Sequence, residues 1–405
     1  MTTKERAVVS ISKCSAYENY EEVLSSVRES LELLGNLDDL FAQNKKILLK
    51  PNLLDHSRGP ESAINAHPTV VRALVQILQE DFGCKTFIGD SSGGVYGKTH
   101  LAFENTGLYD IANELGAELV NFDREEQVTR RYTDNIKLKE FSVPKIIDEV
   151  DCIINVPKLK THDLMDYTGC IKNMFGIIPG SGKRDIHVLA PRANEMADCL
   201  VDIYQTIKPQ LCVMDAVIGM EGAGPSAGTP KKIGLILASR DGVALDSVAT
   251  TIVGFKPLEI LTTEKAFNRK AGEADLNKIA IKGNHIEDVL VQDFKKTYRF
   301  NFARRSILPD FAVRQLWRGQ TGGRPVINNS ECELCGNCVE SCPAKAMEIK
   351  GKKVFINYSK CIECYCCSEL CPNKAVSLKF PLLVRLTGVC MDLAGRLYYL
   401  LRGKS

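Results

Sequence analysis

Eight cysteines near the C-terminus have a spacing that suits iron–sulfur chemistry. They fall in two runs, CELCGNCVESCP and CIECYCCSELCP, and each run reads C-x2-C-x2-C-x3-C-P. The first three thiolates of such a run can wrap one corner of an iron–sulfur cubane, and the fourth ligates the other cluster in proteins that hold two. The spacing therefore predicts two 4Fe–4S clusters as cofactors.

In this pattern the fourth cysteine of each run binds the cluster that the other run holds, so each cluster has four ligands. The first set comprises Cys332, Cys335, Cys338 and Cys371. The second set comprises Cys342, Cys361, Cys364 and Cys367. Structural zinc usually takes two cysteine pairs separated by a longer loop, and a disulfide knot needs an oxidising compartment. Neither alternative accounts for two identical runs that are each closed by proline.

The two runs are also an internal repeat at an offset of 29 residues, at which Glu340 falls on Glu369 and Lys345 on Lys374. A short segment of alternating apolar residues follows each Cys-Pro, which predicts a small pseudo-symmetric α+β module over residues 328–379. This region resembles the bacterial-type two-cluster ferredoxins. Cys366 matches no ligand spacing, so we expect it to pack beside a cluster rather than bind one.

The composition is that of an ordinary globular protein. With 405 residues, 44% of them hydrophobic, the chain has room for two or three domains. A net charge of +2 argues against nucleic acid as a partner. The N-terminal MTTKERAVVSISK has no apolar signal core, and sixteen cysteines without one indicate a reducing compartment. We therefore predict a cytoplasmic protein.

Residues 1–300 alternate short apolar segments with amphipathic ones. Strands are expected at 7–11, 46–50, 86–90, 118–122, 152–156, 211–215 and 234–238. Helices are expected at 17–34, 68–82, 108–116, 192–207 and 244–253. Apolar strands that alternate with helices predict an α/β domain whose largely parallel sheet carries helices on both faces.

Ligands of such a sheet bind outside the carboxyl ends of its strands. Four polar, glycine-rich loops begin there, after KILLK, TFIGD, CIINV and LCVMD. The predicted substrate-binding residues at this edge are Lys50, Asn52, Asp90, Asp215 and Glu221. Of these, Glu221 lies among glycines that allow close approach of a ligand to the backbone.

The loop after CIINV has the densest group of candidate catalytic residues. If PKLKTH is extended, Lys158, Lys160 and His162 share one face, and Lys172 and Asn173 follow a short glycine turn. Such a row of cations would hold a carboxylate or a phosphate; the alternative is a solvated row of lysines. We assign His162, Lys160 and Lys172 to catalysis, and Lys158 and Asn173 to substrate binding.

Two glycine-rich segments do not match the nucleotide-binding motifs that they resemble. GIIPGSGKR has the wrong glycine spacing for a phosphate loop and an arginine in place of Ser or Thr. GAGPSAG misses G-x-G-x-x-G by one residue, so dinucleotide binding has little support. His67 before Pro68 is expected to cap a helix, and Asp246 to be structural.

Two further segments lie around the cysteine module. Residues 301–327 read as a basic linker or helix, and residues 380–405 as an amphipathic helix. Arg385, Asp392 and Arg396 argue against a membrane-spanning helix. The default expectation is that the C-terminal helix docks on the protein, with a dimer contact or a membrane surface as alternatives.

KPNLL, GDSSGG, NVPKLKTH, KNMFG, MDAVIGMEGAGP and DGVALD together resemble the family known as domain of unknown function 362, over about residues 8–320. Many members carry a C-terminal two-cluster ferredoxin, so the resemblance implies an iron–sulfur protein. The family label supplies no reaction. Positions that match its motifs are Lys50, Asn52, Asp90, Lys158, Lys160, His162, Lys172, Asn173, Asp215, Glu221 and Asp246.

Three functions remain open at this stage. The first is an oxidoreductase that relays single electrons from a redox partner protein to a small anionic substrate in the α/β domain. The second is a non-catalytic ferredoxin-type electron-transfer subunit that docks on a redox partner. The third is a non-redox isomerase or lyase in which the clusters are structural.

Overall fold

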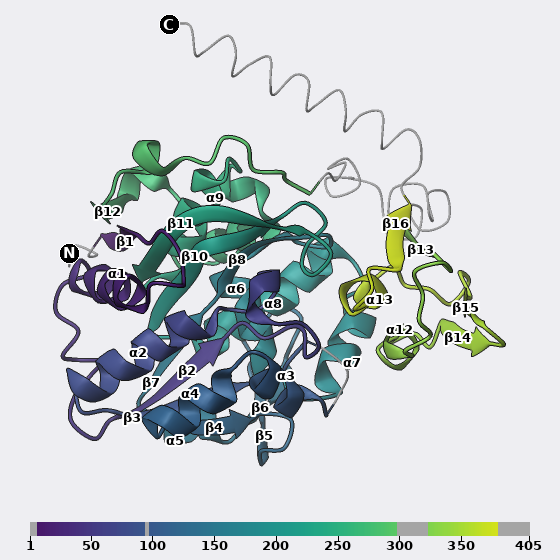
Figure 1. Cartoon of the computed structure of the whole chain (residues 1–405), viewed down its shortest axis with the longest axis horizontal. Helices are drawn as coiled ribbons and strands as arrows, with labels where there is room; N and C mark the ends of the chain where they lie inside the picture. Colours follow the sequence, from purple (N-terminus) through teal and green to yellow (C-terminus); the bar gives the residue numbers. More distant parts are fainter. Residues whose placement is uncertain (1–5, 94–96, 298–322, 380–405) are drawn as a thin grey trace, which may run out of the picture.

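The computed structural model describes residues 6–93, 97–297 and 323–379 (Figure 1). A ten-stranded sheet has the order β12-β1-β11-β10-β7-β2-β3-β4, with β8 paired to β10 and β9 paired to β8. Within the described residues of this sheet, β11 and β9 alone run antiparallel to their neighbours. The prediction of a largely parallel sheet is confirmed.

The strands of this domain are β1 (Ala7–Lys13), β2 (Lys46–Pro51), β3 (Lys85–Asp90), β4 (Glu118–Asn121), β5 (Gln127–Arg131), β6 (Glu140–Pro144), β7 (Cys152–Val156), β8 (Lys158–His162), β9 (Asp166–Thr168), β10 (Leu211–Glu221), β11 (Thr229–Ser239) and β12 (Ile279–Gly283). Its helices are α1 (Tyr20–Glu32), α2 (Pro68–Glu80), α3 (Thr99–Asn105), α4 (Leu108–Leu115), α5 (Ile146–Glu149), α6 (Cys170–Asn173), α7 (Gly182–Leu189), α8 (Ala193–Ile207), α9 (Gly242–Ile252) and α10 (Leu261–Asn268). Every predicted strand and helix has a counterpart here.

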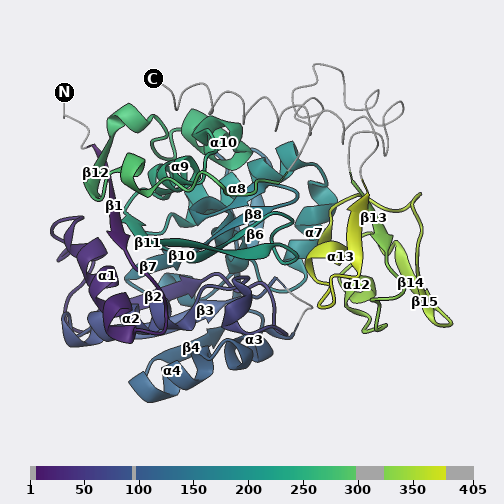
Figure 2. The same cartoon turned by 45° about the horizontal axis from the view of Figure 1, so that its top comes forward.

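Helices cover both faces of the sheet because successive strand residues point to opposite sides. In β2, Ile47 and Leu49 pack in one apolar cluster with α1, α2 and α4. Leu48, between them, packs in a second cluster with α8 and α10. Figure 2 shows these two layers on either side of the strands.

The hairpin of β10 and β11 is longer than the sequence suggests. Its strands extend well beyond the predicted 211–215 and 234–238, and they pair antiparallel from Cys212–Ser239 to Glu221–Thr229. A short connection between neighbouring strands forces this direction, whereas a parallel return needs a crossover. The glycine-rich loop after β10 therefore leads into a strand, as the lack of a dinucleotide helix implied.

The C-terminal module contains two short helices and two strand pairs. They are β13 (Arg324–Ile327) with β16 (Val376–Lys379), β14 (Met347–Lys350) with β15 (Lys353–Ile356), α12 (Asn337–Glu340) and α13 (Cys366–Glu369). The repeat is visible in the backbone, since Leu334 and its counterpart Glu363 both have φ 57°. Strand β13 belongs to the module, although the sequence placed it in the linker.

Residues 301–322 of the predicted linker and the predicted C-terminal helix at 380–405 lie outside the described residues. Among the residues that are described, no helix is long and apolar enough to cross a membrane.

Candidate functional site

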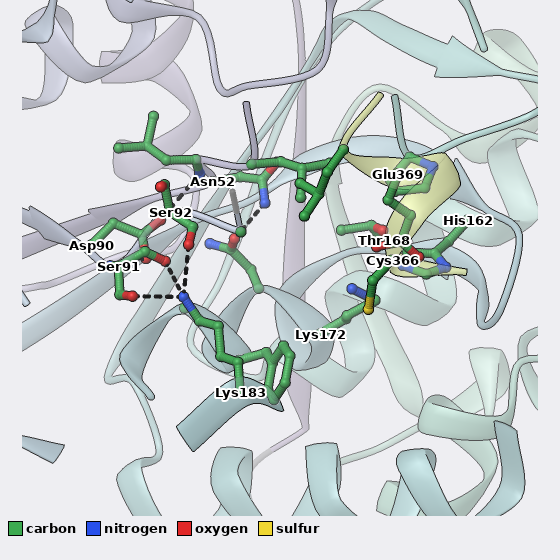
Figure 3. A pocket seen from close by; sticks show the side chains of 18 of the residues that line it. Asn52, Asp90, Ser91, Ser92, His162, Thr168, Lys172, Lys183, Cys366 and Glu369 are labelled. Carbon is green, nitrogen blue, oxygen red and sulfur yellow. Dashed lines mark hydrogen bonds and ion pairs between the residues drawn. The ribbon is translucent and has the colours of Figure 1, made fainter. Parts of the chain in front are cut away.

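A cavity of about 360 Å³ lies between the α/β domain and the module (Figure 3). All four loops that were predicted to gather at the sheet edge contribute to it, for example through Asn52, Ser92, Lys160 and Pro225. The cavity therefore lies at the carboxyl ends of the strands, where a sheet of this kind binds ligands.

One end of the cavity contains a buried ion pair. Lys50 Nζ lies 3.0 Å from Asp90 Oδ1, and both side chains are 1% exposed. Asp90 also accepts backbone N–H groups from Leu53 and Ser91. Burial raises the pKa of Asp90 to about 6, against the opposing effect of the Lys50 charge. A Cβ at Gly176 would lie 2.1 Å from Asp90 Oδ1, so only glycine fits there.

Three amide side chains extend this end into the sheet. Asn52 Nδ2 donates to Asn173 Oδ1 at 2.9 Å, and Asn173 Nδ2 donates to Asn155 Oδ1 at 2.7 Å. Asn155 lies in β7 and is fully buried. It was not predicted as a site residue, although an asparagine inside the apolar run CIINV was a usable signal, because buried amides need partners.

Helix α7 adds a lysine that the sequence analysis missed. Lys183 Nζ donates to Ser91 Oγ at 2.7 Å and to the Ser92 carbonyl at 3.0 Å. Burial lowers the pKa of Lys183 to about 8. It comes from the GSGKR segment, which fails as a phosphate loop but still places a cation and a helix start against the loop after β3.

The opposite end of the cavity contains two further lysines, Lys160 and Lys172. Lys160 Nζ donates to the Ile64 carbonyl at 2.6 Å, and burial lowers the pKa of Lys160 well below its usual value. Lys172 Nζ makes no hydrogen bond or ion pair with any residue that the structure describes, and burial lowers its pKa too. Burial lowers the pKa of the neighbouring His187 to about 4, so that this ring is neutral at pH 7.

His162 connects this end to the module. Its Nδ1 accepts the backbone N–H groups of Leu164 at 3.0 Å and Met165 at 3.3 Å. The neutral ring must then hold its proton on Nε2, which lies 3.4 Å from Glu369 Oε1 in α13. The ring is almost fully buried, so its orientation is fixed by these contacts.

Three predicted substrate-binding residues, Lys158, Asp215 and Glu221, do not line this cavity. Lys158 Nζ lies 2.8 Å from both Asp215 Oδ2 and the Tyr17 hydroxyl, because Asp215 is the residue opposite Lys158 in β10. Glu221 accepts the Lys295 N–H at 2.8 Å. The carboxylates of Asp215 and Glu221 therefore have partners within the protein and stabilise the fold.

Two residues have the structural roles that the sequence suggested. His67 caps α2 by accepting the Thr69 N–H. Asp246 accepts the N–H groups of Cys170 and Ile171 at the start of α6, and burial raises its pKa to about 7.

The cysteines of the module fit iron–sulfur ligation. The first ligand set lines a small cavity of its own, and the N–H of Ala375 donates to Cys371 Sγ at 3.2 Å. The N–H of Ala346 makes the equivalent bond to Cys342 Sγ at 3.2 Å. Hydrogen bonds to the sulfurs tune cluster potentials. No three described His, Cys, Asp or Glu side chains converge on a single metal ion, and cluster thiolates need not, since each binds a separate iron.

Fold and cysteines together define an iron–sulfur protein with an electron-transfer module on an α/β domain. Residues 324–372 match the 4Fe-4S dicluster domain, and residues 47–251 match the family described as Domain of unknown function (DUF362). The chain belongs to this second family. It is 33% identical over 288 residues to a thylakoid-associated protein of Synechocystis, covering 71% of this chain and 87% of that protein.

Two solved structures are more distant. A Thermotoga maritima protein aligns with TM-score 0.37 at 16% identity, and the lactate racemase apoprotein of Thermoanaerobacterium thermosaccharolyticum with TM-score 0.37 at 14% identity. The alignments cover 62% and 60% of this chain, and 59% and 56% of those chains. The cytoplasmic location stays a prediction, because the Synechocystis relative is thylakoid-associated.

Proposed function

We propose that the chain is an iron–sulfur oxidoreductase, which passes single electrons from two 4Fe–4S clusters to a small anionic substrate in the interdomain cavity. The main support for this proposal is the lining of the cavity. The same cavity is lined by lysines of the α/β domain and by Cys366 and Glu369, which lie between ligand cysteines of the module. A ligand there would touch both domains.

The charges of the lining favour an anion. Among the described residues neither Lys172 nor Lys160 forms an ion pair within 4 Å; Glu369 acts on both from a greater distance, and Lys160 donates to a neutral carbonyl. Asp90, by contrast, is already paired with Lys50. Apolar side chains complete the wall, among them Leu164 and Leu200. This lining, in a cavity of about 360 Å³, suits a small acid with an apolar body.

The chain's own groups supply binding and protons. Lys172 and Lys160 would hold the anionic group, and the Lys172 ammonium, whose pKa burial lowers, would supply the proton. His162 offers a hydrogen bond from Nε2–H at the module side of the cavity. When bound, the clusters supply single electrons, which come from an external redox protein. A substrate that gains an electron becomes more basic, so a nearby proton donor stabilises the product.

The test is anaerobic reoxidation of the photoreduced protein by a panel of carboxylates and phosphate esters. We expect at least one acid to reoxidise the reduced clusters and restore their visible absorbance. Lys160→Ala and His162→Ala should slow this, and the exposed Lys352→Ala should leave it unchanged. If no acid or ester binds or reoxidises the protein, the proposal fails. Stable co-purification with a redox protein would then favour the non-catalytic electron-transfer subunit.

A further inference from the structure

The two cysteine runs have equivalent sequences but different surroundings. We call Cys332–Cys342 the outer run and Cys361–Cys371 the inner run. Tyr365 of the inner run is 4% exposed and packs within an apolar cluster of the α/β domain. Its counterpart in the repeat, Gly336, offers no side chain to such a contact. The inner run therefore docks on the α/β domain.

Cys366 follows Tyr365 and lines the cavity. Figure 3 shows its sulfur beside Lys172. The same thiol contacts Cys364, a ligand of the second set, and precedes Cys367, another of that set. A single side chain thus separates the second ligand set from the cavity. The counterpart residue Asn337 is not part of the lining, and the outer run reaches the cavity only through Glu340 and Ser341, next to Cys342 of the same second set.

The first ligand set has a weaker connection to the cavity: Leu370, beside Cys371, lines it, but no residue adjacent to Cys332, Cys335 or Cys338 does. Its small cavity is enclosed by module residues alone, and no described residue of the α/β domain lines it. Cys335 of this set is exposed, so that an external protein can approach this side of the module.

We propose that the two clusters act in a fixed order. The cluster on Cys342, Cys361, Cys364 and Cys367 is the terminal donor to the cavity, and the cluster on Cys332, Cys335, Cys338 and Cys371 accepts electrons from the external donor. This inference rests on the proposed function. It also gives Lys172 a second role, because a cation beside the inner cluster stabilises an added electron there and raises that cluster's reduction potential.

The test is a redox titration of the holoprotein followed by electron paramagnetic resonance, which needs no substrate. In Lys172→Gln we expect one cluster to shift to a more negative potential while the other stays in place. Lys183→Gln is the matched control, because Lys183 lies in the same cavity among Asp90, Asp123 and Lys50 rather than beside Cys366. It should shift the sensitive cluster less.

A second pair of variants identifies the sensitive cluster. Cys366→Ala should perturb the paramagnetic resonance signal of the cluster whose potential Lys172→Gln shifts. Asn337 is at the equivalent position of the outer run, and Asn337→Ala should perturb the signal of the other cluster. Equal shifts of both clusters in Lys172→Gln, or a shift of the cluster that responds to Asn337→Ala, would overturn the order. If reoxidation by every acid fails while these shifts are as expected, the proposed function fails and the inner position of the cluster stands.

Discussion

The two ends of the interdomain cavity use the same residue types for different purposes. At the end near Asp90, Lys50 and Lys183 have a carboxylate, a hydroxyl and carbonyls as partners. At the end near the module, Lys172 has no partner within hydrogen-bonding range among the described residues. A buried cation that is paired holds the structure, and one that is not paired is available to a ligand. Substitutions at the paired end should therefore lower stability, and substitutions at the unpaired end should weaken anion binding.

The largest effect is expected from Asp90→Asn at the paired end. The substitution leaves the Lys50 charge buried without its partner, which should cost about 3–5 kcal/mol of unfolding free energy. Chemical denaturation of the purified protein measures this. The double variant Lys50→Met with Asp90→Asn should recover most of the loss. A single variant within about 1 kcal/mol of the wild type would show that the pair is not structural.

Lys172→Ala at the module end should behave in the opposite way. It should weaken binding of an anion in the cavity by about 10–100-fold, the value of one charge-assisted hydrogen bond, because Lys172 is the cation without a partner there. Stability should be unchanged or slightly higher, since a partly buried charge is removed. Isothermal titration with inorganic phosphate as the probe, alongside Lys352→Ala, checks this. Unchanged phosphate affinity with lower stability would assign Lys172 to the fold.

A change of pH should have a smaller effect on anion affinity. The pKa of Lys183 is lowered to about 8 by burial, so the side chain is mostly charged below pH 8 and mostly neutral above it. Anion affinity should therefore fall a few-fold as the pH rises through 8, and by less than the loss in Lys172→Ala, because Lys183 is hydrogen-bonded elsewhere. Sulfate titrations at pH 7 and pH 9 measure the change, because the charge of sulfate is constant over this range. In Lys183→Gln the fall in anion affinity between pH 7 and pH 9 should be smaller.

Regular features of the sequence were sufficient to predict much of this arrangement. The fixed spacing of the cysteines predicts the iron–sulfur module, and alternating apolar runs predict the strands and helices. Lys50, Asn52, Asp90, Asn173 and the PKLKTH residues Lys160 and His162 reach the cavity because they follow parallel strands.

The placements that differ from the sequence-based expectation depend on pairings between distant residues. Lys158 has the same spacing as Lys160, yet Asp215 lies opposite it in β10, and sequence spacing cannot reveal this neighbour. Lys183 and His187 reach the cavity only because α7 folds back over the loop after β3. The contact of Tyr365 and Glu369 with the α/β domain likewise depends on how two separately folded units meet.

The most direct test of the central claim is single-turnover reoxidation of photoreduced protein by an acid that binds the cavity, compared between wild type and Lys172→Gln. We expect rapid reoxidation in the wild type, inhibition by inorganic phosphate, and a rate at least tenfold lower in the variant at equal cluster content. Reoxidation at the same rate in both proteins, without inhibition by phosphate, would contradict electron delivery through this cavity.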